Sequence, residues 1–143
     1  YLLDKERVKM GNNRPKRPVK TNPKMPIGSR GEIKILEILQ AHDMHFEREF
    51  SFPDLNGSRA PLRFDFAVFD EEGEIDFLIE YQGIQHYQPK EDYFGGQAKF
   101  IQQKEYDKMK RRYCKEHGYI LIAIPYWDDA ILDYDYIMKA AGY

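Results

Sequence analysis

Four polar side chains that could do chemistry lie close together in the sequence: Asp65, Glu80, Gln82 and His86. Two carboxylates held near each other repel, so one takes up a proton or a cation lies between them. A hard divalent ion such as Mg²⁺ prefers oxygen ligands and keeps several waters for chemistry. An imidazole that follows an acid-bearing strand is suited to proton transfer or metal contact. The group predicts a metal-assisted site, and an ordinary amphipathic hairpin with its acids facing solvent is the alternative.

A β-hairpin is predicted to position these residues. Hydrophobic and polar residues alternate over 62–69 and again over 75–82, and side chains on a strand change face at every residue. The acidic segment between the two strands offers Gly73 for a turn that needs positive φ. In an antiparallel hairpin closed there, we expect Asp65 nearly opposite Glu80. The face that carries both acids has the fewer large apolar side chains.

Two more strands and three helices complete the predicted fold. Residues 46–52 form an edge strand followed by a loop at 53–58, and residues 119–124 form a central strand covered on both faces. A strand–helix–strand order implies that 75–82 and 119–124 pair in parallel. The sequence therefore predicts an α/β fold, with a mixed central sheet of about four strands flanked by helices.

The predicted helices have recognisable ends and apolar faces. Ser29 and Glu32 have the spacing of a capping box, which by itself explains Glu32 structurally. The first helix packs through Ile35, Leu36, Ile38 and Leu39. The second covers 97–117 and packs through Phe100, Ile101, Met109, Tyr113 and Cys114. The last covers 130–141, is capped by Asp128 or Asp129, and packs through Ile131, Tyr134, Ile137 and Met138.

Composition predicts one folded domain preceded by a basic arm. The chain has 143 residues, of which 42% are hydrophobic and 32% charged. We expect 1–27 to be a basic extended arm or linker and 28–143 to be the catalytic domain. Cys114 is the single cysteine, which suits a reducing cytoplasm, and no apolar run is long enough to span a membrane. Because the chain begins with Tyr, a further upstream domain is an open expectation.

Basic residues gather in two places although the net charge is −2. One place is the arm, and the other is the polar side of the helix at 97–117. Such clusters predict contact with phosphates, whereas solvated linker and helix surfaces are the alternative. The predicted nucleic-acid contacts are Arg30, Lys16, Arg17, Lys20, Lys104, Lys108 and Arg111.

The order of these motifs resembles a known family. An Asp in a hydrophobic strand, a turn, and then apolar-Glu-x-Gln resembles the PD-(D/E)XK nuclease core, with Gln82 where Lys is commonest. The segment IEYQGIQHY, followed by FGG, a basic helix and LIAIPY, is similar to the very-short-patch-repair-like nucleases. Within them it resembles the phage homing endonucleases described by an EDxHD motif. The similarity spans roughly 29–128.

The resemblance implies a Mg²⁺-dependent endonuclease acting on double-stranded DNA, in a bacterial or phage-infected host cell. It implies one or two metal ions, with Mn²⁺ able to substitute. Asp65 would be the central ligand, beside a backbone carbonyl near Tyr81 or Gln82. His86 would act as general base or proton donor and be held by Asp107, and Glu32 would bind a metal-linked water.

The role of Glu80 stays open at this point. In a PD-(D/E)XK site it would be a metal ligand, with Gln82 positioning water, whereas in the repair-like pattern the chemistry moves to His86. A catalytically inactive nuclease-fold module that binds DNA is the alternative function. A phosphotransfer domain or a metal hydrolase acting on small substrates is disfavoured by the absence of a Gly-rich phosphate loop. Target sequence and oligomeric state do not follow from the sequence.

Overall fold

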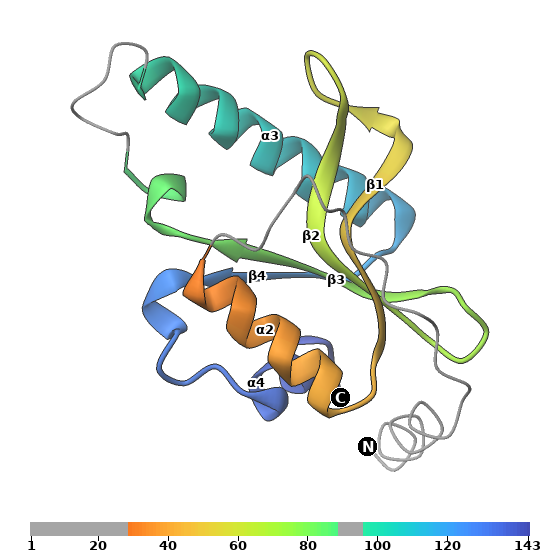
Figure 1. The fold of residues 1–143 in the computed structure, drawn as a ribbon. Helices are drawn as coiled ribbons and strands as arrows, with labels where there is room; N and C mark the ends of the chain where they lie inside the picture. The colour runs from red at the N-terminus through yellow and green to blue at the C-terminus, as the bar shows by residue number, and fades with distance from the viewer. Residues whose placement is uncertain (1–28, 89–95) are drawn as a thin grey trace.

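The computed structural model describes residues 29–88 and 96–143. The predicted basic arm, with Lys16, Arg17 and Lys20, lies outside the described residues. The described chain is a mixed α/β structure built on a four-stranded sheet in the order β1-β2-β3-β4 (Figure 1). The strands are β1 (His45–Asn56), β2 (Pro61–Phe69), β3 (Ile75–Gln82) and β4 (Leu121–Pro125). Neighbours pair antiparallel except β3 and β4, which are parallel. The predicted fold class is confirmed.

Helices cover both faces of the sheet. On one face lie α2 (Arg30–Ala41) and α4 (Tyr134–Ala140), and across the other runs the 22-residue α3 (Gly96–His117) (Figure 1). Two short 3₁₀ turns follow the parallel strands: η1 (Ile84–His86) after β3 and η2 (Tyr126–Asp128) after β4. The carboxyl ends of β3 and β4 therefore open into η1 and η2 at one edge of the molecule.

Each face of the sheet buries its own hydrophobic core. The core under α2 and α4 includes Ile35, Leu39, Phe66, Phe77 and Ile137. The core under α3 is formed by a second cluster, which includes Phe52, Phe64, Leu78 and Cys114. Burial of this apolar area is the main favourable contribution to folding, at about 25 cal/mol per Å² removed from water.

The predictions for the β2–β3 turn and for the start of α2 are confirmed. Gly73 has a φ of 84°, as the turn between β2 and β3 requires. The Ser29 side chain accepts a hydrogen bond from the Glu32 N–H, so α2 begins where the capping box predicts.

The strand at 119–124 was predicted to be central, and this prediction is wrong. In the structure β4 forms one edge of the sheet, and β1 forms the other. Its Ile122 and Ile124 are buried against one core, and Leu121 packs against the other, whereas Ala123 is exposed. The apolar residues of 119–124 therefore indicate that helices cover both faces of the strand. They do not indicate how many strands pair with it.

Two element boundaries also differ from the prediction. β1 is confirmed as an edge strand but extends through 53–56, which was predicted as loop. Pro53 is tolerated there because it falls in the irregular stretch of the β1–β2 ladder, between Ser51 and Asn56. The last helix begins later, with Asp133 rather than Asp128 or Asp129 as its N-cap.

Two residues predicted to pack are exposed instead: Ile131, which precedes α4, and Ile101 near the start of α3. Ile131 lies in the turn before the helix begins, so helical spacing does not apply to it. For Ile101, the inward-facing positions of α3 are set further along the helix by Asp107 and Cys114, both of which are buried.

Gly31 lets the start of α2 approach β3, and we expect Gly31→Ala to destabilise the protein. A Cβ there would come within 2.1 Å of the Tyr81 ring. Ala favours helix by about 1 kcal/mol over Gly, but overpacking costs about 1–3 kcal/mol. Urea unfolding measures the change. The double variant Gly31→Ala/Tyr81→Leu, which removes the clash, should regain stability; equal instability of both variants would contradict this account.

Candidate metal-assisted active site

The strand β2 turns its large apolar side chains from one face of the sheet to the other at Asp65. Leu62 and Phe64 belong to the core under α3, whereas Phe66 and Val68 belong to the core under α2 and α4. The sequence predicted that all four share one face, which is wrong. The neighbouring strand shows the physical reason: Glu49, which faces Asp65 across the ladder, has a left-handed φ of 52° and breaks the regular alternation.

Three carboxylates converge at this bend. One oxygen from each of Glu32, Glu49 and Asp65 lies within 4.8 Å of the other two, and all three residues are half-buried. They come from the first turn of α2, from β1 and from β2. Three carboxylate oxygens at this spacing form a donor set of the kind that a hard divalent cation prefers.

Burial and mutual repulsion make this cluster hard to ionise without a cation. Burial, and then the charges of Glu80 and Glu32, raise the pKa of Asp65 well above its usual range. Burial, and then Glu49, raise the pKa of Glu32. A bound Mg²⁺ would reverse both effects, because an opposite charge favours the ionised carboxylates. The residues present therefore fit a divalent metal.

Glu80 lies nearly opposite Asp65, as the hairpin predicted, but its carboxylate has other partners. The Asp65 N–H donates to Glu80 Oε1 at 2.9 Å, and Lys110 Nζ donates to Glu80 Oε2 at 2.9 Å. Burial raises the pKa of Glu80 in spite of Lys110. The metal-ligand role predicted for Glu80 stays untested, but the structure does not bring its oxygens into the cluster of Glu32, Glu49 and Asp65.

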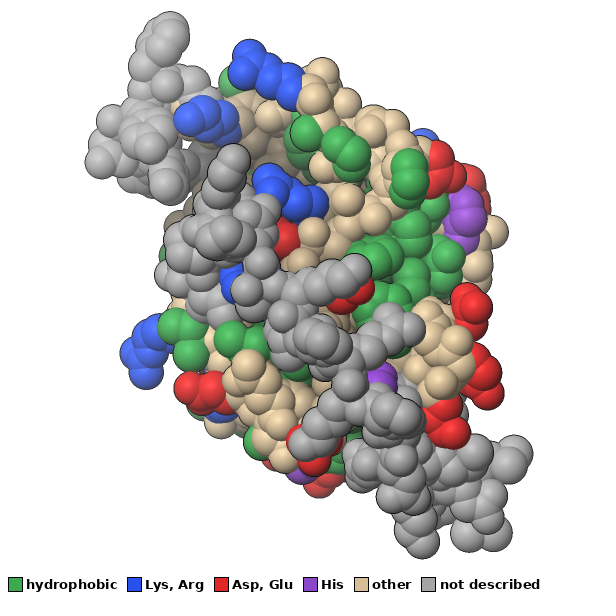
Figure 2. Space-filling model, turned by 45° about the vertical axis from the view of Figure 1, so that its right-hand side comes forward, with side chains coloured by type: hydrophobic (Ala, Val, Ile, Leu, Met, Phe, Trp, Pro, Cys, Tyr) green, Lys and Arg blue, Asp and Glu red, His purple; other side chains and the backbone are tan. Residues whose placement is uncertain are grey.

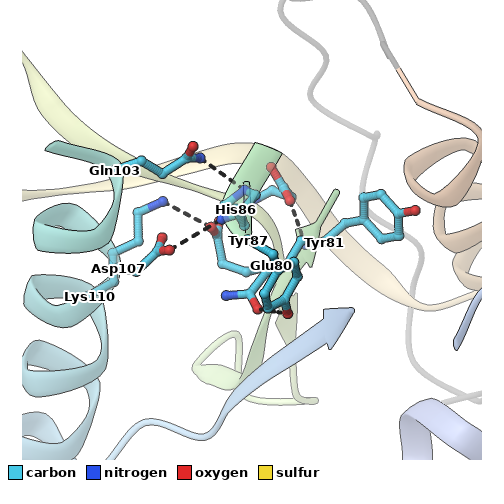
Figure 3. A network of polar contacts seen from close by, with 9 residues as sticks. Glu80, Tyr81, His86, Tyr87, Gln103, Asp107 and Lys110 are labelled. Carbon is cyan, nitrogen blue, oxygen red and sulfur yellow. Dashed lines mark hydrogen bonds and ion pairs between the residues drawn. The ribbon is translucent and has the colours of Figure 1, made fainter. Parts of the chain in front are cut away.

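Asp65 is held by the same hairpin. Its Oδ2 accepts a hydrogen bond of 2.7 Å from the Tyr81 N–H. The Tyr81 ring points the other way, towards α2 (Figure 3), where its hydroxyl donates to Asp129. Burial and this hydrogen bond raise the pKa of Tyr81 to about 12, so the hydroxyl stays protonated. Tyr81 thus connects the backbone beside Asp65 to the η2 turn.

The imidazole of His86 is held on both nitrogens by α3 (Figure 3). Its Nδ1 lies 3.2 Å from Asp107 Oδ2, and its Nε2 lies 3.0 Å from Gln103 Nε2. Both contacts are satisfied when Nδ1–H donates to Asp107 and Nε2 accepts from the amide. The predicted orientation of Asp107 towards His86 is confirmed by this contact, and both side chains are buried. Helical spacing also allows an exposed ion pair between Asp107 and Arg111, but the burial of Asp107 is not compatible with it.

Gln82 fixes an aromatic side chain beside the site. The Tyr87 hydroxyl donates to Gln82 Oε1 at 2.7 Å, and the Tyr87 ring lies 4.7 Å from that of Trp127. Lys104 Nζ lies 5.1 Å from the centre of the Tyr87 ring. The predicted role of Gln82 in positioning water stays a prediction, because the contact made by its carbonyl oxygen is to Tyr87.

The remaining predicted phosphate contacts lie on two elements. Lys104, Lys108 and Arg111 follow helical spacing along α3, and Arg30 is exposed at the start of α2. On the face in Figure 2, acidic side chains gather along the right-hand edge, and most Lys and Arg side chains lie towards the left. Charge is therefore unevenly distributed over this face, although the net charge of the chain is only −2.

Sequence reasoning missed three residues of the site: Glu49, Gln103 and Lys110. Glu49 served only as one of the acids that indicate an edge strand, and the pairing register is what places it opposite Asp65. Gln103 and Asp107 are four residues apart, and Lys110 follows Asp107 by three, so all three share one face of α3. That spacing predicts that the three side chains share one face of the helix. The sequence does not show that this face contacts His86.

Comparisons with known proteins leave the family open. No protein family matches the chain, and no solved structure does. The chain is similar to the uncharacterized protein 033L of Invertebrate iridescent virus 3, at 38% identity over 52 residues. The match covers 36% of this chain and 27% of the viral protein. The nuclease resemblance therefore remains a prediction from motifs. Within 29–88 and 96–143, no helix combines the length and apolar character needed to cross a membrane.

Proposed function

We propose that this protein is a Mg²⁺-dependent endonuclease that hydrolyses phosphodiester bonds of double-stranded DNA, and that it is the catalytic domain of a homing endonuclease. One observation carries the proposal: the carboxylate oxygens of Glu32, Glu49 and Asp65 meet within 4.8 Å. The buried His86, which contacts Asp107, is close enough for its charge to lower the pKa of Glu32 against the larger effect of burial. Phosphodiester hydrolysis needs a nucleophilic water, charge neutralisation at phosphorus and a stabilised leaving oxygen.

Asp65, Glu32 and Glu49 would hold the metal, with Mn²⁺ as a substitute. The bound ion would supply Lewis-acid stabilisation of the phosphate and a water of lowered pKa. Asp65 suits the central position because the Tyr81 N–H fixes one of its oxygens. Glu32 suits an outer position because Ser29 Oγ also contacts its carboxylate, at 3.3 Å.

His86 would move the proton. With Nδ1–H directed at Asp107, Nε2 carries the lone pair that would take a proton from water. The Gln103 amide donates to that lone pair in the structure. A neutral amide is exchanged for water at little cost, so the contact is compatible with proton transfer once substrate is bound.

The electrostatics favour an enzyme over the inactive DNA-binding module. A module that only binds DNA gains from positive charge near phosphates. Three converging carboxylates oppose such binding, and burial makes their ionisation more costly still. A divalent cation resolves the conflict, since it neutralises the acids and attracts the phosphate.

The DNA would lie across the site against the basic side of α3. Lys104, Lys108 and Arg111 are the described residues of that side proposed to contact phosphates, together with Arg30 of α2. The exposed Trp127 beside Tyr87 lies at the carboxyl end of β4. Its flat ring gives this edge an apolar surface next to the charged one.

The experiment that tests this function is cleavage of supercoiled plasmid with Mg²⁺, with Mn²⁺ and with EDTA. We expect nicked or linear product with either metal and none with EDTA. DNA binding is followed in parallel by salt titration in EDTA. Salt-dependent binding without cleavage under either metal would support the inactive module instead and contradict the proposal.

A further inference from the structure

Lys110 differs from the lysine beside it on α3. Its side chain is 13% exposed and its Nζ donates to Glu80 Oε2 at 2.9 Å. The ammonium also lies 5.5 Å from the centre of the Phe64 ring. Lys108, by contrast, is 61% exposed and pairs with Glu105 at 3.9 Å. Lys110 therefore points into the sheet, where it is poorly placed to touch a DNA phosphate.

A continuous chain of contacts runs from Lys110 to Asp65. Glu80 accepts from Lys110 on Oε2 (Figure 3). It accepts from the Asp65 N–H on Oε1. The Tyr81 N–H then donates to Asp65 Oδ2. Asp65, the acid proposed as the central metal ligand, is thus held by two hydrogen bonds to β3, one through its N–H and one through its carboxylate. One of these hydrogen bonds is connected to α3 through Glu80.

The same turn of α3 also holds the imidazole. Asp107 precedes Lys110 by three residues and contacts His86, so the two side chains leave one face of the helix. A buried ion pair contributes little net stability compared with apolar side chains of similar volume. Packing alone therefore gives a weak reason for burying Lys110 and Glu80, whereas a fixed geometry between helix and sheet gives a direct one.

We propose that Lys110 is a positioning residue of the nuclease site, which acts through Glu80 to fix Asp65 relative to His86. This proposal rests on the proposed function. One turn of α3 would then align both the proton-transfer group and the metal-binding acid. Asp107 aligns the proton-transfer group, and Lys110 aligns the acid that would hold the metal.

The test compares Lys110→Met, Lys110→Arg and the double variant Glu80→Gln/Lys110→Met. Lys139→Met on the exposed side of α4 is the control for the substitution itself. Single-turnover plasmid cleavage at saturating Mg²⁺ gives the rate, DNA titration gives the affinity, and electron paramagnetic resonance gives Mn²⁺ binding. Lys110→Met should lower the rate about 10–100-fold, as loss of a residue behind a metal ligand does. DNA affinity should not change.

The double variant separates positioning from stability. It removes the uncompensated charge on Glu80 and keeps an acceptor for the Asp65 N–H, so it should fold as stably as wild type and remain slow. Lys110→Arg should recover part of the rate. A wild-type rate in Lys110→Met, or full recovery in the double variant, would overturn the positioning role alone. A wild type that neither binds Mn²⁺ nor cleaves would overturn the proposed function, and the positioning role with it.

Discussion

Replacing Asp65 by Asn is expected to abolish Mg²⁺-dependent cleavage and to stabilise the metal-free protein at the same time. Loss of the central ligand removes transition-state charge stabilisation of several kcal/mol, which is at least about a 1,000-fold loss of rate. Asn still accepts the Tyr81 N–H through its amide oxygen, so the hairpin keeps its hydrogen bond. Plasmid cleavage measures the first effect, and urea unfolding in EDTA measures the second.

The sign of the stability change follows from the raised pKa of Asp65. A carboxyl whose pKa is raised on folding favours the folded state while protonated, below its unfolded pKa of about 4. That stability is lost as the pH rises through the folded pKa. Asn cannot ionise, so the variant should exceed wild type by about 0.5–2 kcal/mol at pH 8. The difference should vanish at low pH.

Two comparisons sharpen this prediction. Glu49→Gln removes another member of the cluster and should also weaken Mn²⁺ binding, because its oxygen lies within 4.8 Å of the other two. Glu71→Gln, in the exposed turn between β2 and β3, alters an acid outside the cluster and should change neither property. Cleavage retained by a pure Asp65→Asn preparation would place the metal, and the chemistry, elsewhere.

The fold was predictable to the extent that its signals are local. The strands β2 and β3, the turn at Gly73 and the cap at Ser29 depend on neighbouring residues, and all are found. The face that β2 buries is the exception, because it changes at Asp65. The position of β4 depends on which strands pair across the sheet. Its apolar residues fit either an edge or a centre, since helices cover both faces.

The candidate site was predictable in its types of residue and less so in its partners. Asp65, His86 and Asp107 stand out by their motif, and the structure brings His86 and Asp107 together. Glu80 was expected beside a metal, but Lys110 reaches it from a helix 30 positions later in the chain. Glu49 joins the cluster through a left-handed backbone, a local conformation that the alternation of residues does not reveal. Contacts between distant elements decide these roles.

His86→Ala is expected to lower the cleavage rate by about 100- to 10,000-fold, the usual contribution of a general acid or base. Mn²⁺ binding should persist, because the three converging carboxylates are intact. Added imidazole should restore part of the rate, since a small base can enter the space left beside Asp107. Glu80→Gln should be milder, because its Oε1 can still accept the Asp65 N–H.

The His86 substitution leaves Asp107 buried without its partner, so stability must be separated from chemistry. The double variant His86→Ala/Asp107→Asn removes that charge and should fold normally while staying slow. His117→Ala, on the exposed end of α3, controls for loss of an imidazole. If His86→Ala and Glu80→Gln both cleave at the wild-type rate, then neither the buried imidazole nor the Lys110–Glu80 pair takes part. The carboxylate cluster would then have to work with a water that loses its proton to solvent.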